Sequence, residues 1–208
     1  MDQQTKQPLE PRMEAGKALV IAGVQGRYSK ATVGDIPKLW ELFDTCITDI
    51  KKRVGGVTYG VCHNPKHGEF DYMAGVEVPT KADVPGNFEV IEIPPLNYAV
   101  FPHYGPVQAL EQTYERIMFE WLPHSGYKVM GADFERYSAD FDARKGTGTV
   151  EIWLPVLLNM VPTMWNASRV TAESNAWRLP MVDEILLELN PSRSNSPLNA
   201  LELPALTA

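Results

Sequence analysis

The sequence contains few of the residues that covalent or metal cross-links require. Its 208 residues include two cysteines, Cys46 and Cys62, and four histidines. The two cysteines are too far apart in sequence for a redox or zinc motif. Cys62, His63 and His67 lie close together, but three ligands on one turn lack the fourth that a structural zinc site needs. We therefore expect no metal, no cofactor and a reduced cytoplasmic protein.

The sequence also lacks long apolar runs and an excess of positive charge. No stretch approaches the roughly 20 apolar residues of a membrane helix, and residues 1–16 contain no apolar core of a signal peptide. Lys and Arg number 19 and Asp and Glu number 26, which gives a formal net charge of −7. This balance argues against nucleic-acid and membrane partners and leaves room for cationic ligands. Glycine-rich phosphate loops and serine nucleophile elbows are missing as well.

Two segments with helical periodicity match each other at a fixed distance. One begins at Asp35, a good N-cap, and the other follows Pro106, which suits the first position of a helix. Five apolar positions of the first segment recur 71 residues later: Ile36, Leu39, Phe43, Ile47 and Ile50 correspond to Val107, Leu110, Tyr114, Met118 and Trp121. The repeat therefore predicts two equivalent structural units.

Compact or alternating apolar runs around each helix predict strands. The expected strands cover residues 18–23, 57–63, 69–78, 88–93, 97–104, 127–137 and 149–156. Each helix then belongs to a β-α-β-β unit, one at about 17–79 and one at about 88–157. We predict an α+β fold in which this pseudo-twofold pair forms an antiparallel sheet. Both helices should lie on one face, with a ligand groove on the other.

The two ends of the chain fall outside this repeat. Residues 1–16 mix Gln, Pro, Glu and Lys, and we expect a disordered N-terminal arm. Residues 158–208 form a C-terminal extension that should be largely disordered, with a short helix near 181–189. The N-terminal arm is too short for a DNA-binding helix-turn-helix, so we expect a stand-alone domain rather than a complete transcription factor.

The last predicted strand, residues 149–156, carries an unusual pair of side chains. Its Val, Ile and Leu residues point to one face, whereas Glu151 and Trp153 point to the other. A protein core accepts a carboxylate when it is paired, and a solvent-facing surface seldom needs Trp. Glu151 and Trp153 together indicate a groove with aromatic walls and a single acid. In the absence of a ligand, we expect desolvation to raise the pKa of Glu151.

Four other aromatic residues are candidates for the groove walls. Tyr59 and Tyr72 come from the matching strands of the first unit, and each is either a wall residue or a core residue. We place Tyr137, two residues from Glu135, in the groove rather than in cross-strand packing. Trp121 closes the apolar stripe of the second helix, but the turn that follows can bring its ring to the rim of the pocket.

Six segments, in the right order, resemble the GyrI-like effector-binding domains. They cover residues 22–28, 70–78, 98–106, 121–127, 133–137 and 150–156. This family includes the ligand-sensing halves of multidrug-responsive MerR- and AraC-type regulators and stand-alone proteins such as the gyrase inhibitor. The resemblance implies the same pseudo-twofold fold. It also implies a pocket on the sheet face away from the helices, with aromatic rings around a glutamate that falls at Glu151.

The resemblance implies three possible activities. We expect the first, which is binding of a lipophilic small molecule, cations included, for sensing or sequestration. The second is hydrolysis of cyclopropane-type DNA-alkylating compounds with Glu151 as general base. The third is inhibition of gyrase through a protein contact, for which the sequence shows no distinctive surface. The residues expected to bind the small molecule are Glu151, Trp153, Tyr137, Tyr72, Tyr59 and Trp121.

Overall fold

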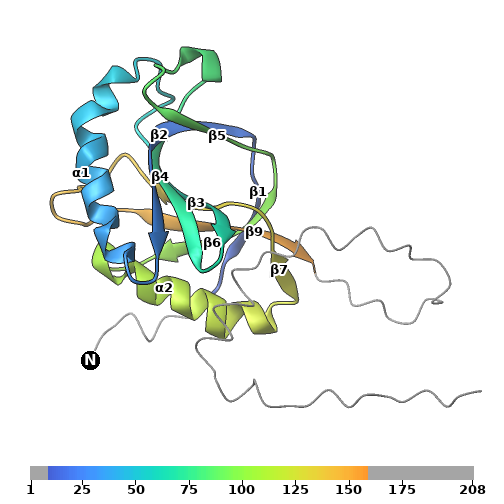
Figure 1. Cartoon of the computed structure of the whole chain (residues 1–208). Helices are drawn as coiled ribbons and strands as arrows, with labels where there is room; N and C mark the ends of the chain where they lie inside the picture. Colours follow the sequence, from blue (N-terminus) through green and yellow to red (C-terminus); the bar gives the residue numbers. More distant parts are fainter. Residues whose placement is uncertain (1–8, 159–208) are drawn as a thin grey trace, which may run out of the picture.

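An antiparallel sheet of nine strands carries both helices on one face (Figure 1). The computed structural model describes residues 9–158. The strands are β1 (Arg12–Ala15), β2 (Leu19–Ser29), β3 (Thr58–Lys66), β4 (Glu69–Glu77), β5 (Glu89–Ile93), β6 (Asn97–His103), β7 (Tyr127–Val129), β8 (Asp133–Tyr137) and β9 (Val150–Leu158). The helices are α1 (Ile36–Cys46) and α2 (Leu110–Arg116). The predicted α+β fold is confirmed.

The order of the strands shows how the two repeats are joined. The sheet runs β1-β6-β9-β8-β3-β4-β2-β5, so the two units β2-α1-β3-β4 and β6-α2-β8-β9 meet between β8 and β3. Each unit is preceded in the chain by a strand that pairs with the other unit. β1 precedes β2 but pairs with β6, and β5 precedes β6 but pairs with β2. β7 lies off this path and pairs with β9.

The two helices differ in regularity. α1 begins directly after Asp35, has a proline in its first turn and buries Leu39 and Phe43 against the sheet. α2 buries Leu110, but its regular α-helical part ends at Arg116. Residues Ile117–Trp121 then form a π-helical turn, and Leu122–His124 form a 3-10 turn. Neither helix of residues 9–158 has the length and apolar character that a membrane crossing requires.

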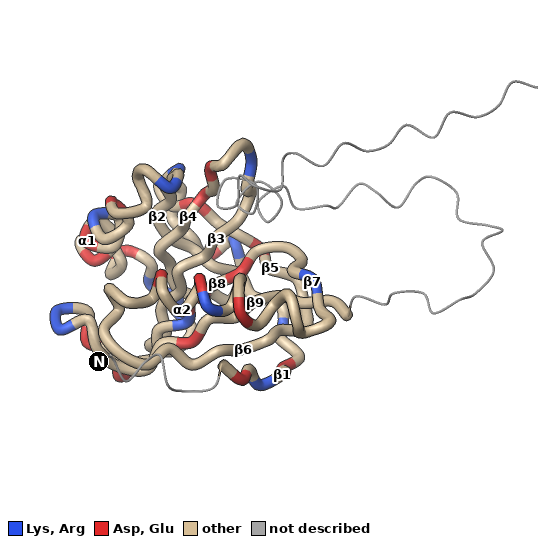
Figure 2. Tube along the Cα trace, turned by 90° about the horizontal axis from the view of Figure 1, so that it is seen from below, with Lys and Arg blue, Asp and Glu red and all other residues tan. Residues whose placement is uncertain are grey.

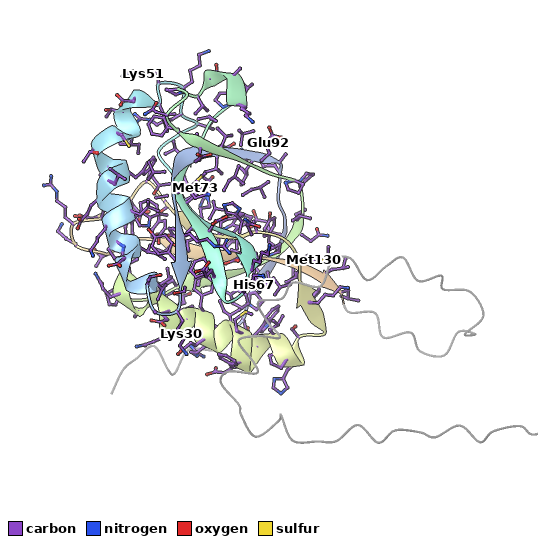
Figure 3. All side chains as sticks on the ribbon, in the orientation of Figure 1. Lys30, Lys51, His67, Met73, Glu92 and Met130 are labelled. Carbon is purple, nitrogen blue, oxygen red and sulfur yellow. The ribbon has the colours of Figure 1, made fainter. Side chains whose placement is uncertain are left out.

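Alternation along the strands sorts the buried side chains into two layers, one on each face of the sheet. The layer under the helices includes Phe43, Tyr72, Phe101, Tyr137 and Ile152. The face away from the helices, called the groove face below, buries Leu19, Ile21, Tyr59, Val61, Met73, Ile93, Tyr98, Val100, Phe134 and Trp153. Figure 1 shows β1 and β5 on the side away from α1, and Figure 3 shows side chains on both sides of the strands, with Met73 labelled. The groove face therefore has its own aromatic and apolar layer.

The structure corrects two predictions at the ends of elements. Residues 1–16 were expected to be a disordered arm, but Arg12–Ala15 form strand β1 along the edge of β6. The sequence Arg-Met-Glu-Ala alternates polar and apolar residues over only four positions, too few to predict a strand, and pairing with β6 orders it. The expected strand over 127–137 is divided into β7 and β8, with Gly131 between them at φ 79°. The extension predicted for 158–208, including the helix near 181–189, lies outside the described residues except for Leu158.

Candidate functional site

A cavity of about 540 Å³ opens on the groove face. Its base comes from β3, β6, β8 and β9, and one wall comes from β1 and the residues that follow it. The lining residues are Arg12, Glu14, Ala15, Gly16, Lys17, Leu19, Val54, Val57, Tyr59, Glu77, Tyr98, Phe134, Arg136, Glu151 and Trp153. The volume lies within the range of about 300–1,000 Å³ that is common for small-molecule sites.

Four aromatic rings from four different strands form the apolar part of this cavity. Phe134 on β8 stands directly opposite Trp153 on β9, and their rings are stacked with centroids 5.4 Å apart. The edge-to-face contacts of Phe134 with Tyr98 and with Tyr59 have centroid distances of 5.4 Å and 5.8 Å. Such contacts hold the rings in fixed positions, so the cavity offers a preformed aromatic surface.

The ring of Tyr98 belongs to this surface, but its hydroxyl group is buried. The residue is 1% exposed, and its Oη is buried with no hydrogen-bond partner among the described residues. Burial raises the pKa of Tyr98 to about 12, so the hydroxyl stays protonated and can donate. A buried polar group without a partner costs about 1–3 kcal/mol, so a hydrogen-bond acceptor near this hydroxyl would be stabilising.

Glu151 lies beside the rings and is held by three side chains. Its carboxylate accepts a hydrogen bond from Trp153 Nε1 at 3.0 Å and pairs with Arg12 Nη1 at 2.8 Å and Arg136 Nη1 at 3.5 Å. The Arg12 guanidinium also lies over the Trp153 ring, 5.6 Å from its centroid. This contact gives a cation–π interaction in addition to the ion pair. The cavity thus already holds one cation between a carboxylate and an aromatic face.

The charge environment reverses the expected pKa shift of Glu151. Burial raises the pKa of this carboxyl, but the hydrogen bonds from Arg12 and Trp153 and the charges of Arg12 and Arg136 lower it, and the net shift is downward. The prediction of a raised pKa is therefore wrong. It considered desolvation without the two arginines, which come from β1 and β8.

A second glutamate lies in the same cavity. Glu77, at the end of β4, pairs with Lys17 Nζ at 2.5 Å and accepts a weak hydrogen bond from Tyr59 Oη at 3.4 Å. A third, Glu14, pairs with Arg12 Nε at 2.9 Å. Figure 2 shows acidic and basic residues together on β1, at the edge of this site. The expected single acid is instead a set of three carboxylates and three cations.

The structure brings together half of the residues predicted for the groove. Glu151 and Trp153 line the cavity, as strand alternation indicated, and Tyr59, for which wall and core were both left open, lines it too. Tyr72 and Tyr137 do not line it, because they lie on the helix-facing side of β4 and β8. Both of these tyrosines donate hydrogen bonds to Glu135, at 2.6 Å and 2.7 Å.

Trp121 also lies away from the cavity. Its ring packs on Phe101 and Tyr127 on the helix-facing side, with centroids 5.0 Å and 6.1 Å away. It borders a separate, smaller cavity of about 210 Å³ with Leu9 and His124. The predicted position at the rim of the groove is wrong, because the π-helical turn keeps this ring over the sheet.

Two buried acids lie between the sheet and the helices, outside the cavity. Glu135 is 6% exposed, and burial raises its pKa to about 7 despite the hydrogen bonds from Tyr72 and Tyr137. Burial also raises the pKa of Asp133 to about 6, although Tyr114 Oη donates a hydrogen bond to it at 3.1 Å. These acids form a structural network at the junction of the two repeats.

Several cavity residues were missed by the sequence analysis. Alternation along 133–137 could have revealed Phe134 and Arg136 as cavity residues, because both point away from Glu135. Pairing of β8 with β9 places them beside Trp153 and Glu151. The equivalent pattern in 97–103 could have revealed Tyr98. No local pattern points to Arg12, which reaches Glu151 through the position of β1 at the edge of the sheet.

Over residues 9–157, the chain matches the protein family described as the GyrI-like small molecule binding domain. It is 30% identical over 152 residues to the transcriptional regulator BrlR of Pseudomonas aeruginosa. That alignment covers 71% of this chain and 56% of BrlR. The chain therefore spans little more than half the length of this curated relative.

Solved structures of other proteins have a similar fold. The structure of SAV2435 bound to tetraphenylphosphonium is similar, with 25% sequence identity and a TM-score of 0.61, over 72% of this chain and 94% of SAV2435. The C-terminal domain of EcmrR has 16% identity and a TM-score of 0.56, over 73% of this chain and 99% of that domain. The likeness to EcmrR concerns the fold alone.

Proposed function

Because the chain belongs to the GyrI-like small molecule binding domain family, we propose that its groove-face cavity binds a lipophilic cation. The observation that carries the proposal is the position of Arg12. Its guanidinium lies against the Glu151 carboxylate and over the Trp153 ring, where a ligand cation would gain the same two interactions. The Arg12 side chain is 47% exposed, so it can move into solvent when a ligand enters. The relative SAV2435, bound to tetraphenylphosphonium, supports this ligand class.

The rest of the cavity fits such a ligand. The rings of Tyr59, Tyr98, Phe134 and Trp153 offer apolar area, and the Glu151 side chain is 14% exposed, so little water screens its charge. Binding would serve sensing or sequestration in the cytoplasm. Together these features support a non-covalent binding site that selects for charge and for aromatic area.

Binding agrees with the chemistry of Glu151 better than hydrolysis does. A general base works best when its pKa lies near the working pH, whereas the arginines and Trp153 lower the pKa of Glu151. Its oxygens are also occupied by those donors. Hydrolysis of cyclopropane compounds and inhibition of gyrase stay predictions from the sequence.

The change Glu151→Gln tests the proposal. We expect it to weaken binding of tetraphenylphosphonium about tenfold, a loss of about 1.4 kcal/mol, because the cation loses its counterion. Binding of triphenylphosphine oxide, which is neutral, should change much less. Calorimetric titration of both ligands measures the difference, and Glu111→Gln, on the exposed side of α2, is the control for loss of one negative charge. Equal losses for the two ligands, or no loss for either, contradict the proposal.

A further inference from the structure

The groove-face cavity contains two largely buried carboxylates with similar environments. The Glu77 side chain is 13% exposed and the Glu151 side chain is 14% exposed. Each is paired with a cation that reaches in from solvent: Lys17 on Glu77, with a side chain 67% exposed, and Arg12 on Glu151. The two carboxylates are fixed in the sheet, whereas the two cations lie on flexible side chains. Both cations can therefore be displaced without a change in the fold.

The two carboxylates form separate sites because a positive charge lies between them. Tyr59, Arg136 and Glu151 stand in one row across the adjacent strands β3, β8 and β9, and Glu77 lies on the next strand, β4, two residues beyond Gly75, which is opposite Tyr59. Tyr59 is directly opposite Arg136, and Arg136 is directly opposite Glu151. Three strand spacings separate β4 from β9, about 14 Å across the sheet, and the two-residue offset of Glu77 adds about 7 Å along the strand, so the two positions are about 16 Å apart. A second ligand cation is therefore stabilised at Glu77 rather than beside the first.

The surface between the two carboxylates points to a ligand independently of their charges. It carries the rings of Phe134 and Trp153, and the Tyr98 ring packs against both of them, with a buried hydroxyl that has no partner among residues 9–158. Buried hydroxyl groups in native proteins are almost always hydrogen-bonded. A ligand that crosses this surface would cover the rings, and a shift of the Tyr98 side chain would let its hydroxyl donate to that ligand.

We propose that the cavity takes an elongated ligand with a cationic group at each end and an apolar or aromatic spacer. One cation replaces Arg12 at Glu151, and the other replaces Lys17 at Glu77, where the Tyr59 ring lies beside the carboxylate. The proposal rests on the proposed function, since the Glu151 end is the same site. It adds Glu77 as a residue that determines specificity. Joining two cations in one molecule makes the second contact intramolecular, which raises affinity.

Calorimetry with two series of quaternary ammonium compounds tests this proposal. Bis(trimethylammonium) alkanes with spacers of roughly eight to sixteen methylenes bracket the distance of about 16 Å. Alkyltrimethylammonium ions of the same chain lengths, used below their micellar concentrations, are the single-headed controls. At the best spacer length, we expect the two-headed compound to bind at least about fivefold more tightly than its single-headed partner.

Two variants assign the effect to the carboxylates. Glu77→Gln should remove the affinity advantage of the two-headed compound, and it should weaken the single-headed compound and tetraphenylphosphonium much less than it weakens the two-headed compound. Glu151→Gln should weaken all three, and Glu111→Gln should weaken none. Equal affinity for one and two heads at every spacer length overturns the proposal, as does an advantage that survives Glu77→Gln. If tetraphenylphosphonium itself fails to bind the unaltered chain, the proposed function fails as well, so the two failures are distinguishable.

Discussion

Arg12 determines how strongly the charge of Glu151 can interact with a ligand cation. In the structure this guanidinium pairs with Glu151 and Glu14 and covers part of the Trp153 ring. A cation that enters the cavity must displace it, and the ion pairs that are lost reduce the apparent affinity. The same contact keeps Glu151 compensated while the cavity holds no ligand.

Replacing this arginine should therefore favour a ligand cation. We predict that Arg12→Gln tightens the binding of tetraphenylphosphonium about two- to fivefold, because an exposed ion pair contributes about 0.2–1 kcal/mol. Calorimetry measures the change, with the exposed Arg144→Gln as the control for the loss of one positive charge. Unchanged or weaker binding in Arg12→Gln would show that Arg12 does not compete with the ligand.

Gly60 leaves room for the buried network under the helices. A Cβ atom at this position would overlap the Tyr72 hydroxyl oxygen and come within 2.5 Å of a Glu135 carboxylate oxygen. Gly60→Ala should lower the free energy of unfolding by about 1–3 kcal/mol, because it separates buried hydrogen-bonded groups. Urea denaturation measures this loss. Gly86→Ala is the matched control, since a Cβ there meets nothing within 4 Å, and an equal loss in both variants would contradict the explanation.

At the level of elements, β1 contributes both stability and part of the cavity wall. Four of its residues pair with β6, and the following Gly16 donates its N–H to the Leu96 carbonyl at 2.7 Å. β1 therefore protects the edge of β6 from solvent.

Removal of β1 should weaken the whole sheet. We predict that a chain beginning at Lys17 has a free energy of unfolding at least about 2 kcal/mol lower than a chain beginning at Leu9, because it loses several strand hydrogen bonds worth about 0.5–1.5 kcal/mol each. Amide hydrogen exchange should also become faster in β6. The two chains can be compared by urea denaturation, and equal stability would show that β1 is dispensable.

Most elements could be predicted from the sequence because their patterns are local. The repeated helical stripes located α1 and α2, and alternation in β9 placed Glu151 and Trp153 on one face, where the structure has them. The face of Tyr72 and Tyr137 could not be predicted in this way. Local alternation shows which residues share one side of a strand. Strand register and helix packing decide which of the two sides meets the helices.

The charged half of the site depends on contacts between distant parts of the chain. Arg12 and Lys17 reach the cavity because β1 pairs with β6, across more than 80 residues of sequence. The alternation in their own segment covers only four residues, so the pairing is mainly a tertiary effect. The pKa of Glu151 was predicted with the wrong sign for the same reason.

At the scale of the whole molecule, the buried acids make stability depend on pH. In the folded state the pKa of Glu135 is raised to about 7 and that of Asp133 to about 6, mainly by burial. The folded state therefore binds protons more tightly than the unfolded state. The stability from this source is complete below the ordinary carboxyl pKa of about 4 and is lost as pH rises through about 6 to 7.

This dependence can be assigned to one side chain. We predict that the free energy of unfolding falls between about pH 5 and pH 8, and that Glu135→Gln removes roughly 2–3 kcal/mol of that fall. Urea denaturation at several pH values measures it, with the exposed Glu111→Gln as the control. Carboxyls whose pKa is lowered in the folded state, such as Asp71 and Glu151, change the free energy of unfolding only at more acidic pH. They are the same in both variants. An unchanged pH profile in Glu135→Gln would show that this acid does not titrate with unfolding.

The crossed pairing of β1 and β5 also bears on how such a molecule can be divided. Each half of the chain provides the outermost strand of the other half, so neither half has a complete sheet of its own. A single half could complete its sheet by exchanging that strand with a second copy, as in a domain-swapped dimer. The intact chain is the fused, single-polypeptide form of such a dimer. The two halves, produced as separate polypeptides, should therefore fold together rather than alone.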